Sequence, residues 1–113
     1  MDMKCCGHDA VSGAWVEISG SPAIQSVDEL IVRPEQGHYV APGFVDIQVN
    51  GFAGADYCSP TTPLALIEHS LNVQFSTGVT RLFPTVITGG REDMVGALRN
   101  LARARRELRH GRA

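Results

Sequence analysis

APGFVDIQVNG, the stretch from Ala41 to Gly51, decides the fold of this chain of 113 residues. Successive side chains of a strand point to opposite faces, so Val45, Ile47 and Val49 share one apolar face. The other face carries Phe44 and then three polar side chains, at Asp46, Gln48 and Asn50. Proline and glycine punctuate both ends of the stretch. We therefore predict a strand whose C-terminal end presents Gln48 and Asn50 together.

Two placements of this strand fit the alternation. In a parallel barrel, the branched side chains pack outward on covering helices, and the inner residues at the C-terminal end face a site. In an ordinary sheet, the same pattern marks an edge strand with one face in water. The pattern by itself does not distinguish the two placements.

The segment after residue 60 predicts a helix, a strand and a second helix. Thr62 and Pro63 suit a helix N-cap and first turn, and an apolar stripe with helical spacing then continues until Gly78. Residues 79–83 predict a buried strand that ends at Pro84, followed by a loop over 85–88. A second covering helix follows Gly89 and Gly90. The two stripes consist of Leu64, Ile67, Leu71 and Phe75, and of Met94, Leu98, Leu101 and Leu108.

The first 40 residues predict short strands. Weak alternation over 14–18 and 23–27, separated by a turn cluster, indicates an antiparallel pair, and 30–32 and 38–40 are two further candidates. Trp15 is expected in a core. Cys5, Cys6 and His8 lack the spacing of a zinc module, so we interpret this end as a frayed terminus.

Residues 41–51 resemble the first barrel strand of the amidohydrolase superfamily, where Pro-Gly-Phe, a hydrophobic residue and Asp precede a metal-binding His-x-His pair. Here Gln48-Val49-Asn50 replaces that pair, as in some N-acetylglucosamine-6-phosphate deacetylases. Residues 77–88, TGVTRLFPTVIT, resemble that family's second strand and the turn after it. The resemblance implies an α/β fold, in which 1–40 form part of a small β-sandwich and 41–113 the first two βα units of a (β/α)8 TIM-like barrel. Such a barrel needs about 250 residues, so it would be incomplete in this chain.

The same resemblance implies a metal-dependent hydrolase that converts N-acetylglucosamine 6-phosphate to glucosamine 6-phosphate and acetate. Gln48 and Asn50 would orient water or substrate near a divalent metal, zinc or similar, and Gly51 and Gly54 would belong to an active-site loop. A tight turn that needs positive φ is the other, and the preferred, explanation of those glycines. The family's principal metal ligands and catalytic aspartate belong to segments beyond residue 113. No catalytic residue or direct metal ligand is therefore expected in this chain, which we expect to be inactive by itself.

Two other functions stay open at this point. The first is another amidohydrolase, acting on a cyclic amide, an acylated amino acid or a nucleobase, although two-metal relatives usually need His-x-His. The second is a non-catalytic remnant that acts as an interaction module or self-associates through exposed strand edges.

Composition narrows the partners and the compartment. Residues 91–113 hold seven arginines against three acids, whereas residues 1–90 hold three basic residues against nine acids. The arginines alternate with Leu and Ala at helical spacing, which favours a solvated helix face over nucleic-acid binding. Three cysteines, two of them adjacent, do not form a secreted disulfide framework, and no apolar run is long enough to span a membrane. We expect a cytoplasmic protein with a sugar-phosphate ligand in its complete form, no nucleic-acid or membrane partner, and the option of homo-oligomers.

Overall fold

The chain divides into two compact units in the structure, a computed structural model that describes residues 3–31 and 37–112. The N-terminal unit is Met1–Pro42 and the C-terminal unit is Gly43–Ala113. Among these described residues, the first unit contains strands and no helix, and the second contains strands and two helices. The fold is therefore mixed α/β, as predicted.

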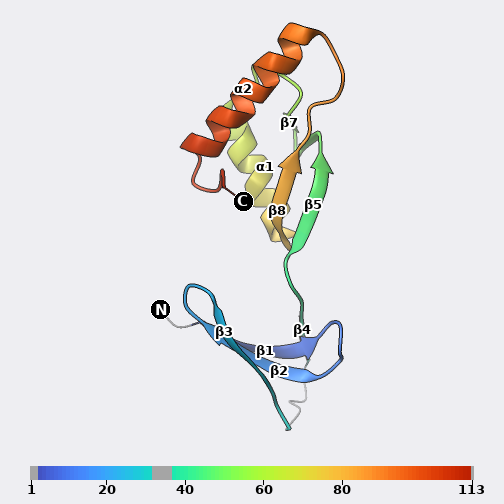
Figure 1. Ribbon diagram of the computed structural model, residues 1–113, viewed down its shortest axis with the longest axis vertical. Coiled ribbons are helices and arrows are strands. Elements are labelled where there is room, and N and C mark those ends of the chain that lie inside the picture. The colour runs from blue at the N-terminus through green and yellow to red at the C-terminus, as the bar shows by residue number, and fades with distance from the viewer. Residues whose placement is uncertain (1–2, 32–36, 113) are drawn as a thin grey trace. The chain divides into compact units, whose positions relative to one another are not determined.

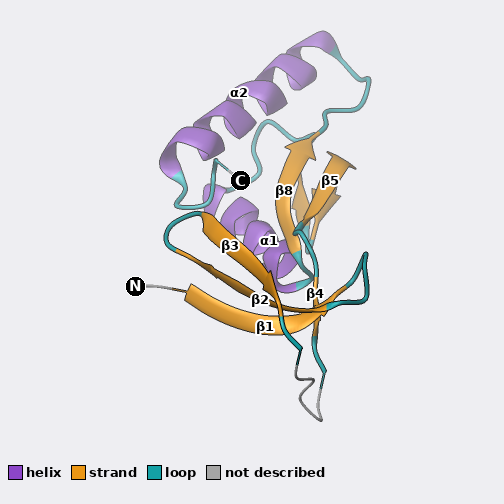
Figure 2. Ribbon diagram, turned by 60° about the horizontal axis from the view of Figure 1, so that its bottom comes forward, coloured by secondary structure: helices purple, strands orange, loops and turns teal. Residues whose placement is uncertain are grey.

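The N-terminal unit is a four-stranded sheet of order β3-β2-β1-β4 (Figure 2). Its strands are β1 (Met3–Asp9), β2 (Trp15–Gly20), β3 (Ile24–Glu29) and β4 (Tyr39–Val40). β1, β2 and β3 pair antiparallel through short turns, whereas β4 pairs with β1 in parallel. The predicted antiparallel pair and the short strand near residue 40 are confirmed. Trp15 is buried as expected, with its ring edge-on to His8.

Two predictions for this unit are wrong. The expected frayed terminus is the inner strand β1, which is hydrogen-bonded to β2 from Met3 through His8. Backbone hydrogen bonds to strands on both sides hold β1 in place. The side-chain pattern of residues 3–9 does not indicate a strand. Leu30 and Ile31 do not form the predicted strand, because β3 ends at Glu29 and Ile31 is fully exposed. Val32 lies outside the described residues.

One face of this sheet carries a small charged cluster. The ammonium nitrogen of Lys4 lies 2.9 Å from Glu17 Oε1, and Cys6 Sγ donates to Glu17 Oε2 at 3.6 Å. The hydrogen bond and the charge of Glu17 raise the pKa of Lys4. Local desolvation, followed by the hydrogen bond to Glu17, raises the pKa of the Cys6 thiol. Desolvation and Glu17 therefore favour the protonated, less nucleophilic form of Cys6, whereas the charge of Lys4 opposes them.

The turn between β1 and β2 is closed by Asp9. Its carboxylate accepts hydrogen bonds from the backbone N–H of Ser12 at 2.9 Å, from the Ser12 hydroxyl, and from the N–H of Val11 at 3.3 Å. These bonds, led by the Ser12 hydroxyl, lower the pKa of Asp9. Gly13 supplies the positive φ of 73° that ends the turn.

The C-terminal unit follows the predicted strand-helix-strand-helix order (Figure 1). β5 (Phe44–Val49) and β8 (Val79–Pro84) form a parallel pair, and α1 (Leu64–Ser76) connects them. A small hairpin, β6 (Gly51–Phe52) and β7 (Ala55–Asp56), lies between β5 and α1. α2 (Arg91–Glu107) ends the unit, and both helices lie on one side of the β5–β8 pair.

The core of this unit lies between the strand pair and the helices. Its buried members are Val49, Ala55, Tyr57, Ile67, Leu71, Leu82 and Ala104. The predicted stripe of the first helix supplies Ile67 and Leu71, which confirms its orientation. Apolar residues that pack around this core include Leu64, Phe75, Leu101 and Leu108.

Three details differ from the sequence expectations. Val45 and Ile47 are 49% and 79% exposed, because the two helices cover β5 only near Val49 among the described elements. Leu98 is 53% exposed, and α2 instead buries Ala97 and Ala104, whose small side chains allow close approach. Thr62 does not cap α1, since its hydroxyl donates to the carbonyl of Asp56 and Pro63 holds the N-cap position.

Candidate functional site

The C-terminal ends of β5 and β8 meet at one edge of the pair, because the strands are parallel. This is the edge where parallel α/β proteins gather functional side chains. The backbone N–H of Thr85 donates to Val49 O at 2.8 Å, and Asn50 Nδ2 donates to Thr85 O at 3.2 Å. The half-buried Asn50 therefore ties the end of β5 to the chain that follows β8.

Gln48 lies two residues earlier and behaves differently. It is exposed on β5, and its backbone N–H donates to Asp46 Oδ1 at 3.1 Å. Its side-chain amide can therefore meet solvent or a ligand. The predicted pair thus separates into one side chain fixed to the protein and one that is accessible.

Gly51 and Gly54 lie in the β6–β7 hairpin directly after Asn50. Ala53 and Gly54 have φ of 47° and 86°, as in a two-residue turn with positive φ at both positions. A Cβ at Gly51 would overlap the carbonyl oxygen of Ala55. Close approach to Ala55 thus requires a glycine at Gly51, and Gly54 alone of the two has the positive φ that the turn explanation predicts.

Cys58 is a member of this edge that the sequence did not indicate. Its half-buried Sγ lies 3.7 Å from Thr85 O and 3.9 Å from Asn50 O, and it accepts the N–H of Ile87 at 3.5 Å. Its own N–H donates to Asp56 Oδ1 at 2.8 Å. The only available signal was its position in the loop after the first strand of a parallel pair.

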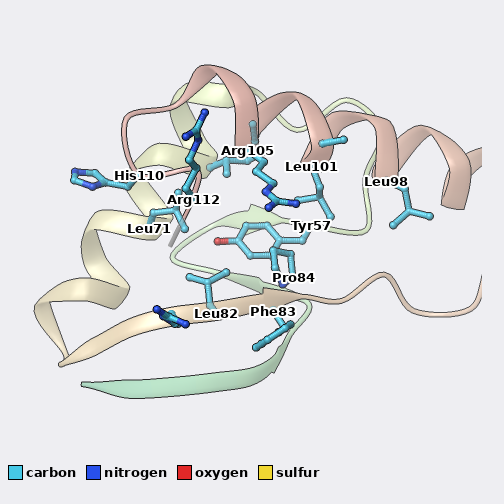
Figure 3. A pocket seen from close by; sticks show the side chains of 15 residues that line it. Tyr57, Leu71, Leu82, Phe83, Pro84, Leu98, Leu101, Arg105, His110 and Arg112 are labelled. Atoms are coloured by element: carbon cyan, nitrogen blue, oxygen red, sulfur yellow. The ribbon is translucent and has the colours of Figure 1, made fainter. Parts of the chain in front are cut away.

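A buried polar network fixes the loop that carries these residues. Tyr57 Oη shares a hydrogen bond of 2.8 Å with Ser70 Oγ and accepts one of 3.1 Å from Gln74 Nε2. All three side chains are at most 3% exposed. Ser70 and Gln74 lie one turn apart on α1, so the helix holds Tyr57 at two points. Figure 3 shows the Tyr57 ring directed between the strands and the helices.

The possible metal ligands at this edge are neutral amides, a thiol, backbone carbonyls and the single carboxylate of Asp56, which already accepts the Cys58 N–H. In residues 3–31 and 37–112 no three His, Cys, Asp or Glu side chains come together as a metal-binding group. Gln48 and Asn50 are weak zinc ligands, although amides can orient water or substrate by hydrogen bonds. The residues present do not fit the inner shell of a divalent metal. In the same described part, no helix is long and apolar enough to cross a membrane.

Comparison with known proteins identifies the class of fold. The solved structure of N-acetylglucosamine-6-phosphate deacetylase from Pasteurella multocida superposes with a TM-score of 0.61 at 20% identity. That superposition covers 83% of this chain and 27% of the solved one, and it shows a shared fold. No family model matches.

Sequence similarity leads to the same proteins. The chain is 38% identical over 60 residues to the N-acetylglucosamine-6-phosphate deacetylases of Mus musculus and of Rattus norvegicus. The match covers 50% of this chain and 14% of each relative, so the chain spans only a small part of their length. The predicted resemblance to the N-terminal portion of such a deacetylase is thereby confirmed.

Proposed function

We propose that this chain is the N-terminal portion of a metal-dependent deacetylase that converts N-acetylglucosamine 6-phosphate to glucosamine 6-phosphate and acetate. Residues 1–40 form part of its small β-sandwich, and residues 41–113 form the first two βα units of its (β/α)8 barrel. The observation that carries the proposal is the 38% identity over 60 residues to two proteins of that name. The parallel β5–β8 pair, with polar side chains at its C-terminal edge, is compatible with this barrel.

Gln48 and Asn50 have separate roles in this proposal. The exposed amide of Gln48 orients a water molecule or the substrate, whereas Asn50 positions the chain after β8 through its bond to Thr85 O. When bound, a divalent metal such as zinc polarises the amide carbonyl and activates water. Because the side chains described at this edge do not fit the inner shell of that metal, other ligands would hold it. The isolated chain is accordingly proposed to be inactive.

A chimaera tests this function. The portion of the Pasteurella multocida deacetylase that superposes on this chain is replaced by this chain, and acetate release from N-acetylglucosamine 6-phosphate is measured with added zinc. We expect release that a chelator abolishes. An intact, metal-loaded chimaera that releases no acetate would refute the proposal.

Two variants of the chimaera distinguish the proposed roles of the Gln48 and Asn50 side chains. Gln48→Ala should lower kcat/KM by roughly 10- to 100-fold without loss of stability, as is typical when a group that supports a metal site is removed. Asn50→Ala should lower both activity and stability, the latter by about 1 kcal/mol for the lost hydrogen bond. His69→Ala, on the exposed face of α1, is the matched control and should change neither.

A further inference from the structure

The segment 56–58 joins helix α1 to the chain that follows β8. Tyr57 is 1% exposed, and two polar side chains of α1 hold its hydroxyl. The next residue, Cys58, contacts the other side, where its half-buried Sγ lies 3.7 Å from Thr85 O and accepts the N–H of Ile87 at 3.5 Å. A single short segment therefore contacts both a helix and the C-terminal edge of the strand pair.

Three hydrogen bonds fix the backbone of this segment. The N–H of Tyr57 donates to Asn50 O at 2.8 Å. The N–H of Cys58 donates to Asp56 Oδ1, also at 2.8 Å, and the hydroxyl of Thr62 donates to the carbonyl of Asp56. Helix α1 and the end of β5 thus set the position of the Cys58 Sγ atom independently of the chain after β8.

The chain after β8, residues 85–88, has few other contacts. The backbone N–H and C=O of Thr85 both bond to residues 49 and 50. Further along, Ile87 is 57% exposed. Among the described residues, the Cys58 thiol is the one acceptor of the Ile87 N–H. The sulfur therefore holds this segment at a second point, two residues beyond the first.

A thiol suits this position because it can donate and accept at once. Its S–H can be directed at Thr85 O, at 3.7 Å, or at Asn50 O, at 3.9 Å, while the sulfur accepts from Ile87. Sulfur is a weak donor and a weak acceptor, so these bonds contribute little to the stability of the whole unit. Their effect is local and falls on a segment that is also bonded to Asn50.

We propose that Cys58 is a positioning residue in the proposed deacetylase. It ends a bridge from α1 that holds residues 85–88 beside Gln48 and Asn50, at the edge proposed to face the substrate. Cys58 acts through the backbone of residues 85–88, without contact to the substrate. The inference rests on the function proposed above, but its first test needs no deacetylase activity.

The first test measures amide hydrogen exchange in the full chain, resolved by residue with NMR. Cys58→Ala should speed exchange of the Ile87 N–H by about fivefold, because its acceptor is lost. The Thr85 N–H donates to Val49 O, so it is the internal control and should change little. Cys58→Ser keeps a donor and an acceptor on a shorter side chain and should restore part of the protection.

Two results of this test would overturn the bridge. One is an unchanged Ile87 rate in Cys58→Ala. The other is an equal Ile87 rate in Cys58→Ala and Cys58→Ser, because it would mean that the thiol only fills space. The urea midpoints of both variants should stay close to that of the unchanged chain, which separates a local effect from general destabilisation.

The second test uses the kinetics of the chimaera. Misplacement of groups at a site is felt in the transition state, so Cys58→Ala should lower kcat about tenfold and leave KM nearly unchanged. Cys58→Ser should recover part of kcat. Cys5→Ala, which removes an exposed thiol of the N-terminal unit, is the control and should change neither constant.

The two tests separate the failures. Faster exchange at Ile87 with unchanged kcat in Cys58→Ala would overturn the positioning role, and so would a change confined to KM. A chimaera that releases no acetate even without these substitutions would refute the proposed function. The exchange rates would still decide whether Cys58 holds the chain after β8.

Discussion

Replacing Tyr57 by Phe tests whether the buried network anchors the loop that carries the candidate site. The change removes only the hydroxyl that bonds to Ser70 Oγ at 2.8 Å and to Gln74 Nε2 at 3.1 Å. The ring is 1% exposed, so water cannot replace the missing oxygen without rearrangement. Ser70 can turn its hydroxyl to the carbonyl four residues earlier in α1.

Gln74 has no such alternative, since its amide is 3% exposed and loses its acceptor. An unsatisfied buried donor costs about 1–3 kcal/mol, so Tyr57→Phe should lower the free energy of unfolding of the C-terminal unit by about 2 kcal/mol. When both partners of a buried bond become apolar, the cost is small. The double variant Tyr57→Phe/Gln74→Leu should therefore regain most of that loss.

The assay is urea unfolding followed by two signals. Both helices belong to the C-terminal unit, so far-ultraviolet circular dichroism reports mainly on that unit, and fluorescence of the single Trp15 reports on the N-terminal one. We expect the dichroism midpoint alone to move. His69→Ala, on the exposed face of α1, is the control. A loss below about 0.5 kcal/mol for Tyr57→Phe, the range of surface substitutions, would show that this reasoning is wrong.

Two further predictions concern the N-terminal unit. Because the pKa of Asp9 is lowered, its contribution to stability is complete above its ordinary value of 3.8 and is lost as the pH falls through the lower, folded-state value. The urea midpoint seen by Trp15 fluorescence should therefore fall in acid, and an unchanged acid dependence in Asp9→Asn would contradict this. Because Glu17 contributes to the raised pKa of the Cys6 thiol, Glu17→Gln should speed alkylation of Cys6 by iodoacetamide. Mass spectrometry of the modified peptides checks this rate with Cys5 as internal reference, and equal Cys6 rates in both proteins would count against it.

The order of elements after residue 43 could be predicted because each has a strong local pattern. The stripe with helical spacing places α1 within two residues of its observed bounds, and Pro84 marks the end of β8. Strand β1 could not be predicted, because hydrogen bonds to β2 and β4 hold it rather than its own alternation. The prediction that the apolar face of β5 is buried was wrong at Val45 for a related reason. Val45 is apolar, but no described element covers it.

For the candidate site, too, the local features could be predicted from the sequence, whereas the contacts between distant residues could not. The sequence by itself determined that Gln48 lies near the end of a strand and that Asn50 and a glycine turn follow it, because alternation and backbone freedom are local properties. Only the tertiary structure decided that Asn50 is held by Thr85, that Cys58 lies beside both, and that Tyr57 is anchored to α1. These contacts join residues 8 to 35 positions apart. Such pairs depend on how the helices pack on the strands, which no local pattern specifies.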